Sequence, residues 1–496
     1  MSRTESSTDP QHLHRRRLLA ARLERIDRWG LSPLFITVIG MGMLFVQYDI
    51  FNINVTFSQT CTELLRGCTP ETAVTHIGGA ILASLIGYGV GALVLGRAAD
   101  RFGRHSTLIV SMLVTGVGSA WSALTGDFTG FVLSRLVTGI GVGADLAIIN
   151  TYVNEVAPKQ LRAKFTSVLF LLAGVGAVLA IWLGLLFSTP ATPWPDGLPF
   201  ALASESFGSG WRWVYGIGAI LAAVSLFLRF RLPESPRWLL SAHRLDQAEA
   251  VIGDMELRAS RKGPLRDPDP VPDVGEAAEA GAAPGTVTIA AHRSGSVART
   301  ILGNPVLRRR MIVLSLAWMF AYVTLYTFGG AFTPALTGLG YSMPVAGMIS
   351  AIGILGFLVS GVFATLFSER LERRTWMAVG TVIGVIGVFL VAFSGENLAL
   401  VYIGAVILFF GQNLWVAPQY ALTAEAYPTE VRATAYAWTD SIGHVGGGIG
   451  VFVIAGLLQG LDPLVTLLVL MAFMAIGSVI NLAAPKTRGC SLEEIS

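Results

Sequence analysis

Long apolar runs alternate with short polar connections along this chain. Twelve of these runs are long enough to cross a lipid bilayer as a helix, which takes roughly 20 apolar residues. They cover residues 34–57, 74–96, 106–124, 129–153, 164–187, 210–230, 311–333, 344–367, 375–394, 399–421, 434–458 and 463–484. In lipid every backbone polar group must be hydrogen-bonded within its own segment. The pattern therefore predicts an all-α membrane protein with twelve transmembrane helices.

Charge and composition agree with this reading and add an orientation. Only 14% of the 496 residues are charged and 53% are hydrophobic, whereas soluble domains carry about 25% charged residues. With both termini on one side, all but three of the 35 Lys and Arg residues fall on that side, the exceptions being Arg66, Arg212 and Arg135. The positive-inside bias then predicts cytoplasmic termini in a plasma membrane, with a bacterial inner membrane expected.

The longest polar stretch divides the twelve runs into two sets of six. We expect a cytoplasmic tail over 1–33, an N-terminal half over 34–230, a cytoplasmic central loop over 231–310, a C-terminal half over 311–484 and a second tail over 485–496. Residues from Leu245 to Leu257 predict a short amphipathic helix. The Pro-, Gly- and Ala-rich stretch from Gly263 to Gly295 predicts a flexible linker.

An internal repeat supports the division into halves. Glu, Pro, Arg and Ala occur at 155, 158, 162 and 163 after the fourth run, and again 270 residues later at 425, 428, 432 and 433. Asp100-Arg101-Phe102-Gly103-Arg104 after the second run has a counterpart in Glu369-Arg370-Leu371-Glu372-Arg373 after the eighth. Two six-helix halves in parallel repeat are a known transporter design, with the solute held between the halves.

Several motifs carry a resemblance to a known family. Gly96-x-x-x-Asp100-Arg101-x-Gly103-Arg104 resembles the loop signature of the major facilitator superfamily, and Arg135-x-x-x-Gly139-x-Gly141-x-Gly143 resembles its fourth-helix signature. The stretches 233–239 (PESPRWL) and 485–495 resemble the sugar-porter and metabolite:proton symporter branch. The resemblance implies the major facilitator fold of two six-helix halves.

The same resemblance implies a cytoplasmic gate. Asp100, flanked by Arg101 and Arg104, can pair with charges or helix ends of neighbouring loops, and such pairs can break when the halves separate. The alternative is ordinary solvated loop charge. The predicted gate residues are Gly96, Asp100, Arg101, Gly103, Arg104, Glu155, Arg162, Glu369, Arg370, Glu425 and Arg432.

Charges inside the apolar runs are the candidates for proton coupling, because a charge near mid-bilayer costs several kcal/mol. Asp49 lies roughly 6 Å and Arg135 roughly 10 Å to the same side of their helix midpoints, so the two can be neighbours. Tyr48-Asp49 resembles the position of the protonatable acid in proton symporters of this branch. Asp145 resembles an acidic position of the phosphate and organic-ion branches, for substrate or a second proton. A purely structural ion pair of Asp49 and Arg135 is the alternative.

Polar and aromatic side chains at similar depths are the candidates for solute binding. Asp440 and His444 are four residues apart and so share a helix face, where they can titrate near physiological pH. Trp318, Tyr322 and Tyr326 form one stripe at a spacing of four, for which packing is the alternative. The predicted substrate-binding residues are Tyr48, Asn52, Asn150, Trp318, Tyr322, Tyr326, Gln412, Asn413, Trp415, Asp440 and His444.

Two departures from the family patterns leave the substrate open. The paired glutamines of sugar porters are absent from the seventh run. The Arg that is frequent in organic-ion carriers is replaced by His444. The sequence predicts a secondary active transporter that carries a small polar or ionic metabolite inward together with protons, by alternating access. The alternatives are proton-driven export, an uncoupled facilitator, and a non-transporting nutrient sensor.

The sequence excludes other classes of activity. We find no set of residues typical of an enzyme, no metal-ligand spacing, and no motif that calls for a cofactor. The arginine runs 15–17 and 308–310 flank helices and anchor topology rather than bind nucleic acid. The expected partners are the solute, protons and the lipid bilayer, with the protein as a monomer. Cys61 and Cys68 form either a local disulfide or two inert thiols.

Overall fold

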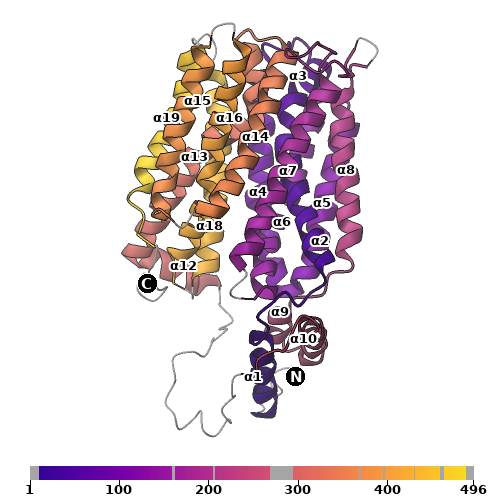
Figure 1. Cartoon of the computed structure of the whole chain (residues 1–496), viewed down its shortest axis with the longest axis vertical. Coiled ribbons are helices and arrows are strands. Elements are labelled where there is room, and N and C mark those ends of the chain that lie inside the picture. The colour runs from indigo at the N-terminus through magenta and orange to yellow at the C-terminus, as the bar shows by residue number, and fades with distance from the viewer. Residues whose placement is uncertain are drawn as a thin grey trace.

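The computed structural model describes residues 10–158, 162–204, 207–268, 294–367, 370–394, 397–428, 431–457 and 463–487. Long helices run along one axis to form an elongated bundle (Figure 1). Eleven helices in the described part are long and apolar enough to cross a membrane. A further long helix, α18 (Arg432–Leu457), carries polar residues in its first half and packs against α4 and α13. The predicted all-helical membrane fold is confirmed.

The first half of the bundle contains six spans. Its helices are α2 (Pro33–Phe51), α3 (Ile53–Leu64), α4 (Ala73–Phe102), α5 (Arg104–Leu124), α6 (Phe128–Val156), α7 (Arg162–Ser188) and α8 (Gly210–Arg229). The first predicted span is interrupted at Asn52, which ends α2 and precedes α3. The backbone at Asn52 keeps helical dihedrals, and its N–H bonds to the Tyr48 carbonyl.

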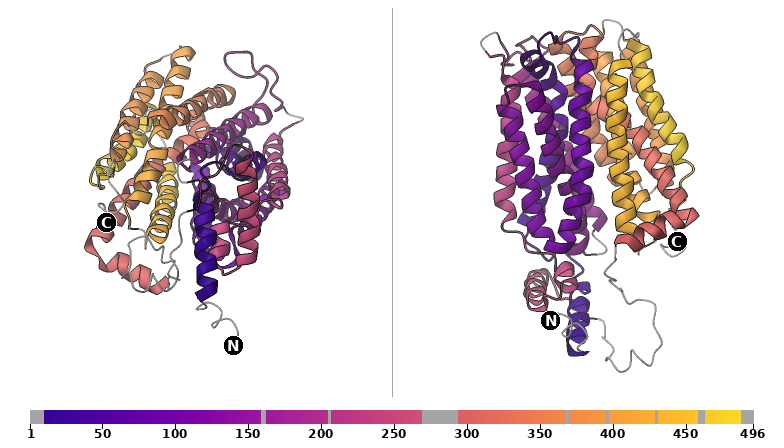
Figure 2. Two further views of the ribbon diagram at one scale, coloured as in Figure 1. Left: turned by 60° about the horizontal axis from the view of Figure 1, so that its bottom comes forward. Right: turned by 180° about the vertical axis from the view of Figure 1, so that it is seen from behind.

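The second half repeats this arrangement. Its helices are α13 (Pro305–Gly338), α14 (Met343–Phe367), the short 3-10 helix η2 (Arg373–Thr375), α15 (Trp376–Ala392), α16 (Leu398–Leu414), α17 (Val416–Glu425), α18 and α19 (Pro463–Asn481). The tenth predicted span is divided at Trp415 into α16 and α17. The two halves lie side by side, joined where α4 packs on α18 and α7 on α14 (Figure 2).

Four short helices lie at the end of the bundle where both termini are found, which we call the terminal end (Figure 1). They are α1 (Pro10–Glu24), α9 (Pro236–Ser241), α10 (Leu245–Ser260) and α12 (Ser294–Gly303). Helix α10 is the predicted amphipathic helix, whereas α1 was not predicted. Most of the predicted linker lies outside the described residues. The opposite end, made by the loops after α3, α7 and α15, is called the loop end.

Helix α1 is bound to α10 by apolar packing and by ion pairs. Leu23 and Met255 are buried. Arg22 Nη2 lies 2.7 Å from Glu256, and Arg15 lies 2.6 Å from Glu249. These contacts hold α1 against α10 beneath the first half (Figure 1).

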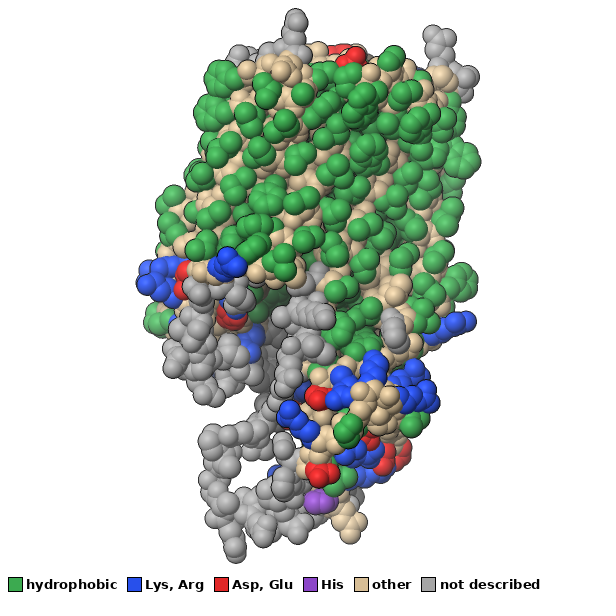
Figure 3. All heavy atoms as spheres, in the orientation of Figure 1, with side chains coloured by type: hydrophobic (Ala, Val, Ile, Leu, Met, Phe, Trp, Pro, Cys, Tyr) green, Lys and Arg blue, Asp and Glu red, His purple; other side chains and the backbone are tan. Residues whose placement is uncertain are grey.

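The surface separates by chemistry along the long axis. In Figure 3 hydrophobic side chains cover the body of the bundle, whereas Lys and Arg gather at the terminal end. Phe227, Val479 and Leu124 are among the large apolar side chains that are more than two-thirds exposed. Such an apolar belt suits contact with lipid.

At the loop end, Cys61 and Cys68 are joined in a disulfide. Of the two alternatives left open by the sequence, a local disulfide or two inert thiols, the structure shows the disulfide.

Candidate functional site

A buried ion pair links α2 to α6. The guanidinium of Arg135 donates to both carboxylate oxygens of Asp49 at 3.1 and 2.9 Å, and to the Asp49 carbonyl at 2.8 Å. Ser119 of α5 donates to the same carboxylate at 3.0 Å. Each residue of the pair is 1% exposed. The structure thus places Asp49 and Arg135 together, as their depths in the sequence predicted.

A second buried ion pair lies closer to the terminal end of the first half. Asp145 accepts hydrogen bonds from both terminal nitrogens of Arg229, and from Ser111 at 2.8 Å. Arg229 is fully buried at the end of α8. Arg229 is among the Lys and Arg residues that the sequence places at the cytoplasmic end of the helices, but its side chain turns inward and neutralises Asp145.

Aromatic rings from the second half gather at the boundary between the halves. We call Trp318, Tyr322, Tyr326, Trp415 and Tyr420 the aromatic cage. The Trp318 ring lies 4.7 Å from Tyr322, 5.3 Å from Trp415 and 4.8 Å from Tyr420. The Tyr322 and Tyr420 hydroxyls are 3.0 Å apart. The predicted stripe on α13 therefore meets the break between α16 and α17.

His444 and Asp440 of α18 adjoin this cage and touch the first half. The His444 ring is stacked on Tyr88 of α4 at 3.9 Å and lies 4.2 Å from Tyr322. Tyr88 donates a hydrogen bond to Oδ2 of Asp440 at 2.9 Å. Tyr88 is not among the residues predicted from the sequence to bind the solute, although it is the one aromatic residue in the Gly-rich run 87–96. Tyr88 thus joins the two halves at this site.

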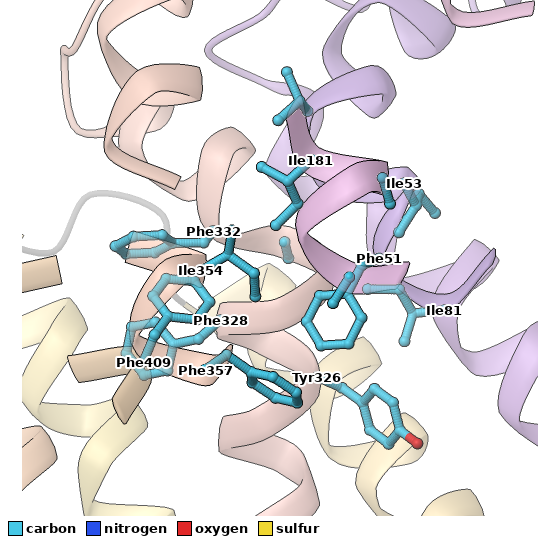
Figure 4. Close-up of a cluster of buried hydrophobic side chains, with 14 of the residues drawn as sticks. Phe51, Ile53, Ile81, Ile181, Tyr326, Phe328, Phe332, Ile354, Phe357 and Phe409 are labelled. Carbon is cyan, nitrogen blue, oxygen red and sulfur yellow. The ribbon is translucent and has the colours of Figure 1, made fainter. Parts of the chain in front are cut away.

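A small, mainly apolar cavity lies between the first ion pair and the cage. Arg135 and Tyr326 both line it, together with Ile50, Ile53, Ala80, Ile81, Ser84, Leu85 and Gly330. Figure 4 shows the apolar side chains around this region, with the Tyr326 hydroxyl pointing away from the cluster of phenylalanines. The cavity brings the neighbourhood of Asp49 within reach of the aromatic cage.

Other predicted binding residues face elsewhere. The Tyr48 hydroxyl donates to the Val214 carbonyl of α8, within the first half. Asn150 donates to the Leu146 carbonyl of its own helix. Asn52 is fully buried, and neither atom of its amide has a hydrogen-bond partner among the described residues.

The amides of α16 are turned into the second half. Gln412 donates to the Met471 sulfur, and Asn413 donates to the Phe357 carbonyl. Of the α16 and α17 residues predicted to bind the solute, the structure brings Trp415 to the cage. The Gln412 and Asn413 amides are therefore bonded within the second half, whereas aromatic side chains gather at the site.

The predicted gate residues of the first half form a compact group. The Arg104 guanidinium lies 3.0 Å from Glu155 and 2.9 Å from Asp100, whose side chain is 76% exposed. Glu234, from the PESPR motif, accepts the backbone N–H groups of Arg104 and His105 at the start of α5. A carboxylate at a helix N-terminus is favoured by the helix dipole.

Two glycines in the gate differ sharply in their surroundings. Gly103 has φ +105°, and a Cβ there would lie 2.1 Å from the Glu234 carboxylate. Gly96 has no atom within 4 Å of its Cβ position. Only Gly103 is required by the local geometry. Arg101 packs on the neighbouring Phe102 ring.

The second half repeats this pair. Arg373 lies 2.7 Å from Glu425, and these two residues are the counterparts of Arg104 and Glu155 in the sequence repeat. Arg370 instead packs over the Phe367 ring, and Arg432 donates to the Tyr427 carbonyl. Glu369 and the Arg162 side chain lie outside the described part. Among the described gate residues, each ion pair joins groups of the same half.

Further contacts between the halves lie toward the loop end. Asn54 of α3 donates to the carbonyls of Phe328 and Gly329 on α13, at 3.1 and 2.7 Å, and accepts from Thr333 at 2.6 Å. Tyr402 of α16 donates to the Pro195 carbonyl of the loop after α7. These hydrogen bonds hold the halves together toward the loop end.

Comparison with known proteins agrees with this arrangement. A family model for sugar (and other) transporters matches residues 35–496. The niacin transporter NiaP of Acinetobacter baylyi is 25% identical over 96% of this chain and 99% of its own. A D-xylose transporter of Levilactobacillus brevis is 27% identical over 72% of each chain. The xylose transporter XylE from E. coli, in a partially occluded inward-open conformation, has a TM-score of 0.69 at 19% identity and covers 93% of this chain.

The match spans both halves, and the folds agree over nearly the whole chain. The family and these relatives are transporters rather than enzymes, and two repeated six-helix halves are a known transporter design. The chain belongs to the family of sugar (and other) transporters, within the major facilitator superfamily.

Proposed function

We propose that this protein takes up a small polar or ionic metabolite together with protons, by alternating access between its two halves. The terminal end then faces the cytoplasm, since Lys and Arg gather there and the positive-inside bias applies to such loops. A plasma membrane, and in bacteria the inner membrane, is the matching location. The protein works as a monomer because each chain contains both halves and the site between them.

The buried pair of Asp49 and Arg135 is the observation that carries the proton coupling. Both residues are 1% exposed, and Arg135 lines the cavity that reaches Tyr326. Desolvation favours the protonated form of a carboxyl, whereas a guanidinium beside it favours the ionised form. A change in the Asp49–Arg135 distance during the transport cycle would shift this balance and so bind or release a proton.

The pattern of contacts supports alternating access. Asn54 and Tyr402 link the halves at the loop end. Arg104–Glu155 and Arg373–Glu425 are pairs within single halves at the terminal end. We propose that the gate charges exchange partners between the halves when the protein turns outward, and that the loop-end hydrogen bonds break in the same step.

We propose the aromatic cage, with Asp440 and His444, as the place where the solute is held. Its rings provide flat apolar faces against which a ring-shaped solute can pack. The names of relatives include carriers of niacin and of pentoses, both ring compounds. The amides of Gln412 and Asn413 bond within their own half, so the cage favours a planar ring over a hydroxyl-rich sugar.

Transport in proteoliposomes tests this function. Counterflow of sugars, phosphate, aromatic acids and nicotinate-like compounds should identify a solute, and an imposed inward proton gradient should then drive its accumulation. Asp49→Asn should abolish accumulation while leaving counterflow, which needs no net proton movement. Accumulation that ignores the pH gradient or an uncoupler would remove the proton coupling and leave an uncoupled carrier.

A further inference from the structure

Three carboxylates in the described transmembrane helices are less than a tenth exposed, and they are not equivalent. Asp49 and Asp145 each receive two hydrogen bonds from an arginine. Asp440, which is 7% exposed, has no Arg or Lys partner in the described part of the chain. A charge at this depth is costly unless it is compensated. The negative charge of Asp440 is therefore not balanced by an arginine or lysine, as those of Asp49 and Asp145 are.

The hydrogen bonds around Asp440 leave one of its carboxylate oxygens without a donor. Tyr88 donates to Oδ2 at 2.9 Å. The other oxygen, Oδ1, is buried and has no hydrogen bond within the described residues. His444 is the nearest titratable group, with Nδ1 3.4 Å from Oδ1 and 2.9 Å from the Asp440 carbonyl. Because a carbonyl only accepts, the Nδ1 proton is directed to the backbone rather than to the carboxylate.

The rings around this carboxylate are arranged for a positive charge. Tyr322 and Tyr326 lie 4.2 and 5.9 Å from the His444 ring, and Trp318 and Tyr420 complete the wall. The face of an aromatic ring carries partial negative charge and attracts cations, more strongly when water is excluded. No arginine or lysine of the described residues lines this wall. Among the described residues of this wall His444 alone is basic, so an anion would meet a carboxylate and ring faces with only an imidazole to neutralise it.

We propose that Asp440 and the aromatic cage bind the positively charged nitrogen of a flat organic cation. Oδ1 faces the cation, the rings of Trp318, Tyr322 and Tyr326 contact its flat faces, and Tyr88 keeps or gives up its bond to Oδ2 as the halves move. This assignment of substrate class rests on the proposed function of the cage as the solute site. It adds the sign of the charge that the site selects, which the proposed function leaves open.

A matched series of pyridines tests the charge directly. N1-methylnicotinamide, which is methylated on the ring nitrogen, is a permanent cation. Nicotinamide is its neutral relative, and nicotinate is an anion of nearly the same shape. Trp318 and Trp415 lie in the cage, so quenching of tryptophan fluorescence in the purified full chain reports binding without transport. We expect the cation to bind about tenfold or more tightly than either of the others.

Variants of Asp440 and Tyr88 sharpen the test. Asp440→Asn should abolish the preference for the cation, whereas Asp440→Glu should retain it. Tyr88→Phe, which removes the competing donor, should not weaken cation binding. The inference is wrong if the wild type binds the neutral compound or the anion at least as tightly as the cation, if the cation does not bind, or if Asp440→Asn keeps the preference.

Counterflow separates this inference from the proposed function. If the protein exchanges nicotinate or a sugar but no cation, the carrier function stands and the cation assignment falls. If no compound of any charge is exchanged although the cation quenches fluorescence, the binding site stands and the transport proposal falls.

Discussion

Asp145 and Arg229 form an ion pair inside the first half, between α6 and α8, with each side chain at most 1% exposed. Ser111 adds a further hydrogen bond to the carboxylate. Bringing two charges out of water is costly, and their mutual attraction offsets this cost only while both partners are present. The stability of the half therefore depends on the pair more than on either residue.

Removing one partner of this pair should destabilise the protein strongly. We expect Asp145→Asn alone to cost about 3–5 kcal/mol of stability, because it leaves a buried guanidinium unpaired. Combined with Arg229→Met, the same change should restore much of that loss, as measured by the midpoint of thermal unfolding in detergent.

The double variant also distinguishes a structural pair from a proton site. If Asp145→Asn with Arg229→Met folds and still accumulates solute in response to a pH gradient, Asp145 carries no essential proton. Loss of gradient-driven accumulation in a well-folded double variant, with counterflow retained, would instead assign Asp145 to the coupling path.

Gly103 is a position where an added methyl group has no space. Its φ is +105°, and a Cβ would lie 2.1 Å from the Glu234 carboxylate that caps α5. Gly103→Ala should cost about 1–3 kcal/mol through backbone strain and loss of that cap. Thermal unfolding should show a lower midpoint for this variant.

Gly96→Ala is the matched control for Gly103→Ala. Gly96 is helical and has open space at its Cβ position, so alanine should be neutral or stabilising by up to about 1 kcal/mol. Equal midpoints for the two variants would show that the contact with Glu234 does not constrain this loop.

Asn54 should bias the carrier toward the conformation closed at the loop end. Its three hydrogen bonds to α13 join the two halves and are lost when they part there. Asn54→Leu should remove about 1–3 kcal/mol from the closed state. A cysteine introduced by Ile81→Cys, which lines the central cavity, should then react faster with an impermeant thiol reagent applied at the loop end.

Thr62→Val supplies the comparison for Asn54→Leu. Thr62 is also near the loop end, but it bonds only to the Gln59 carbonyl of its own helix among the described contacts. Its replacement should leave labelling at position 81 unchanged. Labelling that is equally slow in both variants would mean that the Asn54 network does not hold the halves together.

The docking of α1 on α10 should depend on pH. Hydrogen bonding by Arg15 lowers the pKa of Glu249 below its ordinary 4.5. A carboxyl whose pKa is lowered by folding stabilises the folded form above its ordinary pKa, and this stabilisation disappears as pH falls through the folded value. As pH falls below 4.5 the docking of α1 should weaken progressively, which would appear as faster amide hydrogen exchange in α1.

Two variants of α10 check the origin of this pH response. Glu249→Gln should weaken docking at neutral pH and reduce its dependence on acid. Asp254→Asn removes a carboxylate that pairs with Arg258 of the same helix and should leave α1 protected. If amide exchange in α1 depended on pH in Glu249→Gln as it does in the wild type, carboxyl groups other than Glu249 would be responsible for the pH dependence.

The sequence determined the architecture and part of the site. Runs of about 20 apolar residues can only be helices in lipid, and the repeat at an offset near 270 predicted two equivalent halves. The structure shows the repeat as matched ion pairs, Arg104–Glu155 and Arg373–Glu425. The sequence also predicted that Asp49 and Arg135 can be neighbours. The rise per residue of a helix converts residue number into depth in the membrane, and the two residues lie on the same side of their helix midpoints.

Tertiary structure decided which side chains face one another across helices. Rotation about the helix axis is not fixed by hydrophobicity when a helix is buried on several faces. The sequence therefore could not show that Arg229 turns inward to Asp145, that Gln412 faces Met471 or that Tyr88 meets Asp440. Contacts between the halves depend on how two separate bundles dock, and no local pattern in either half records that docking.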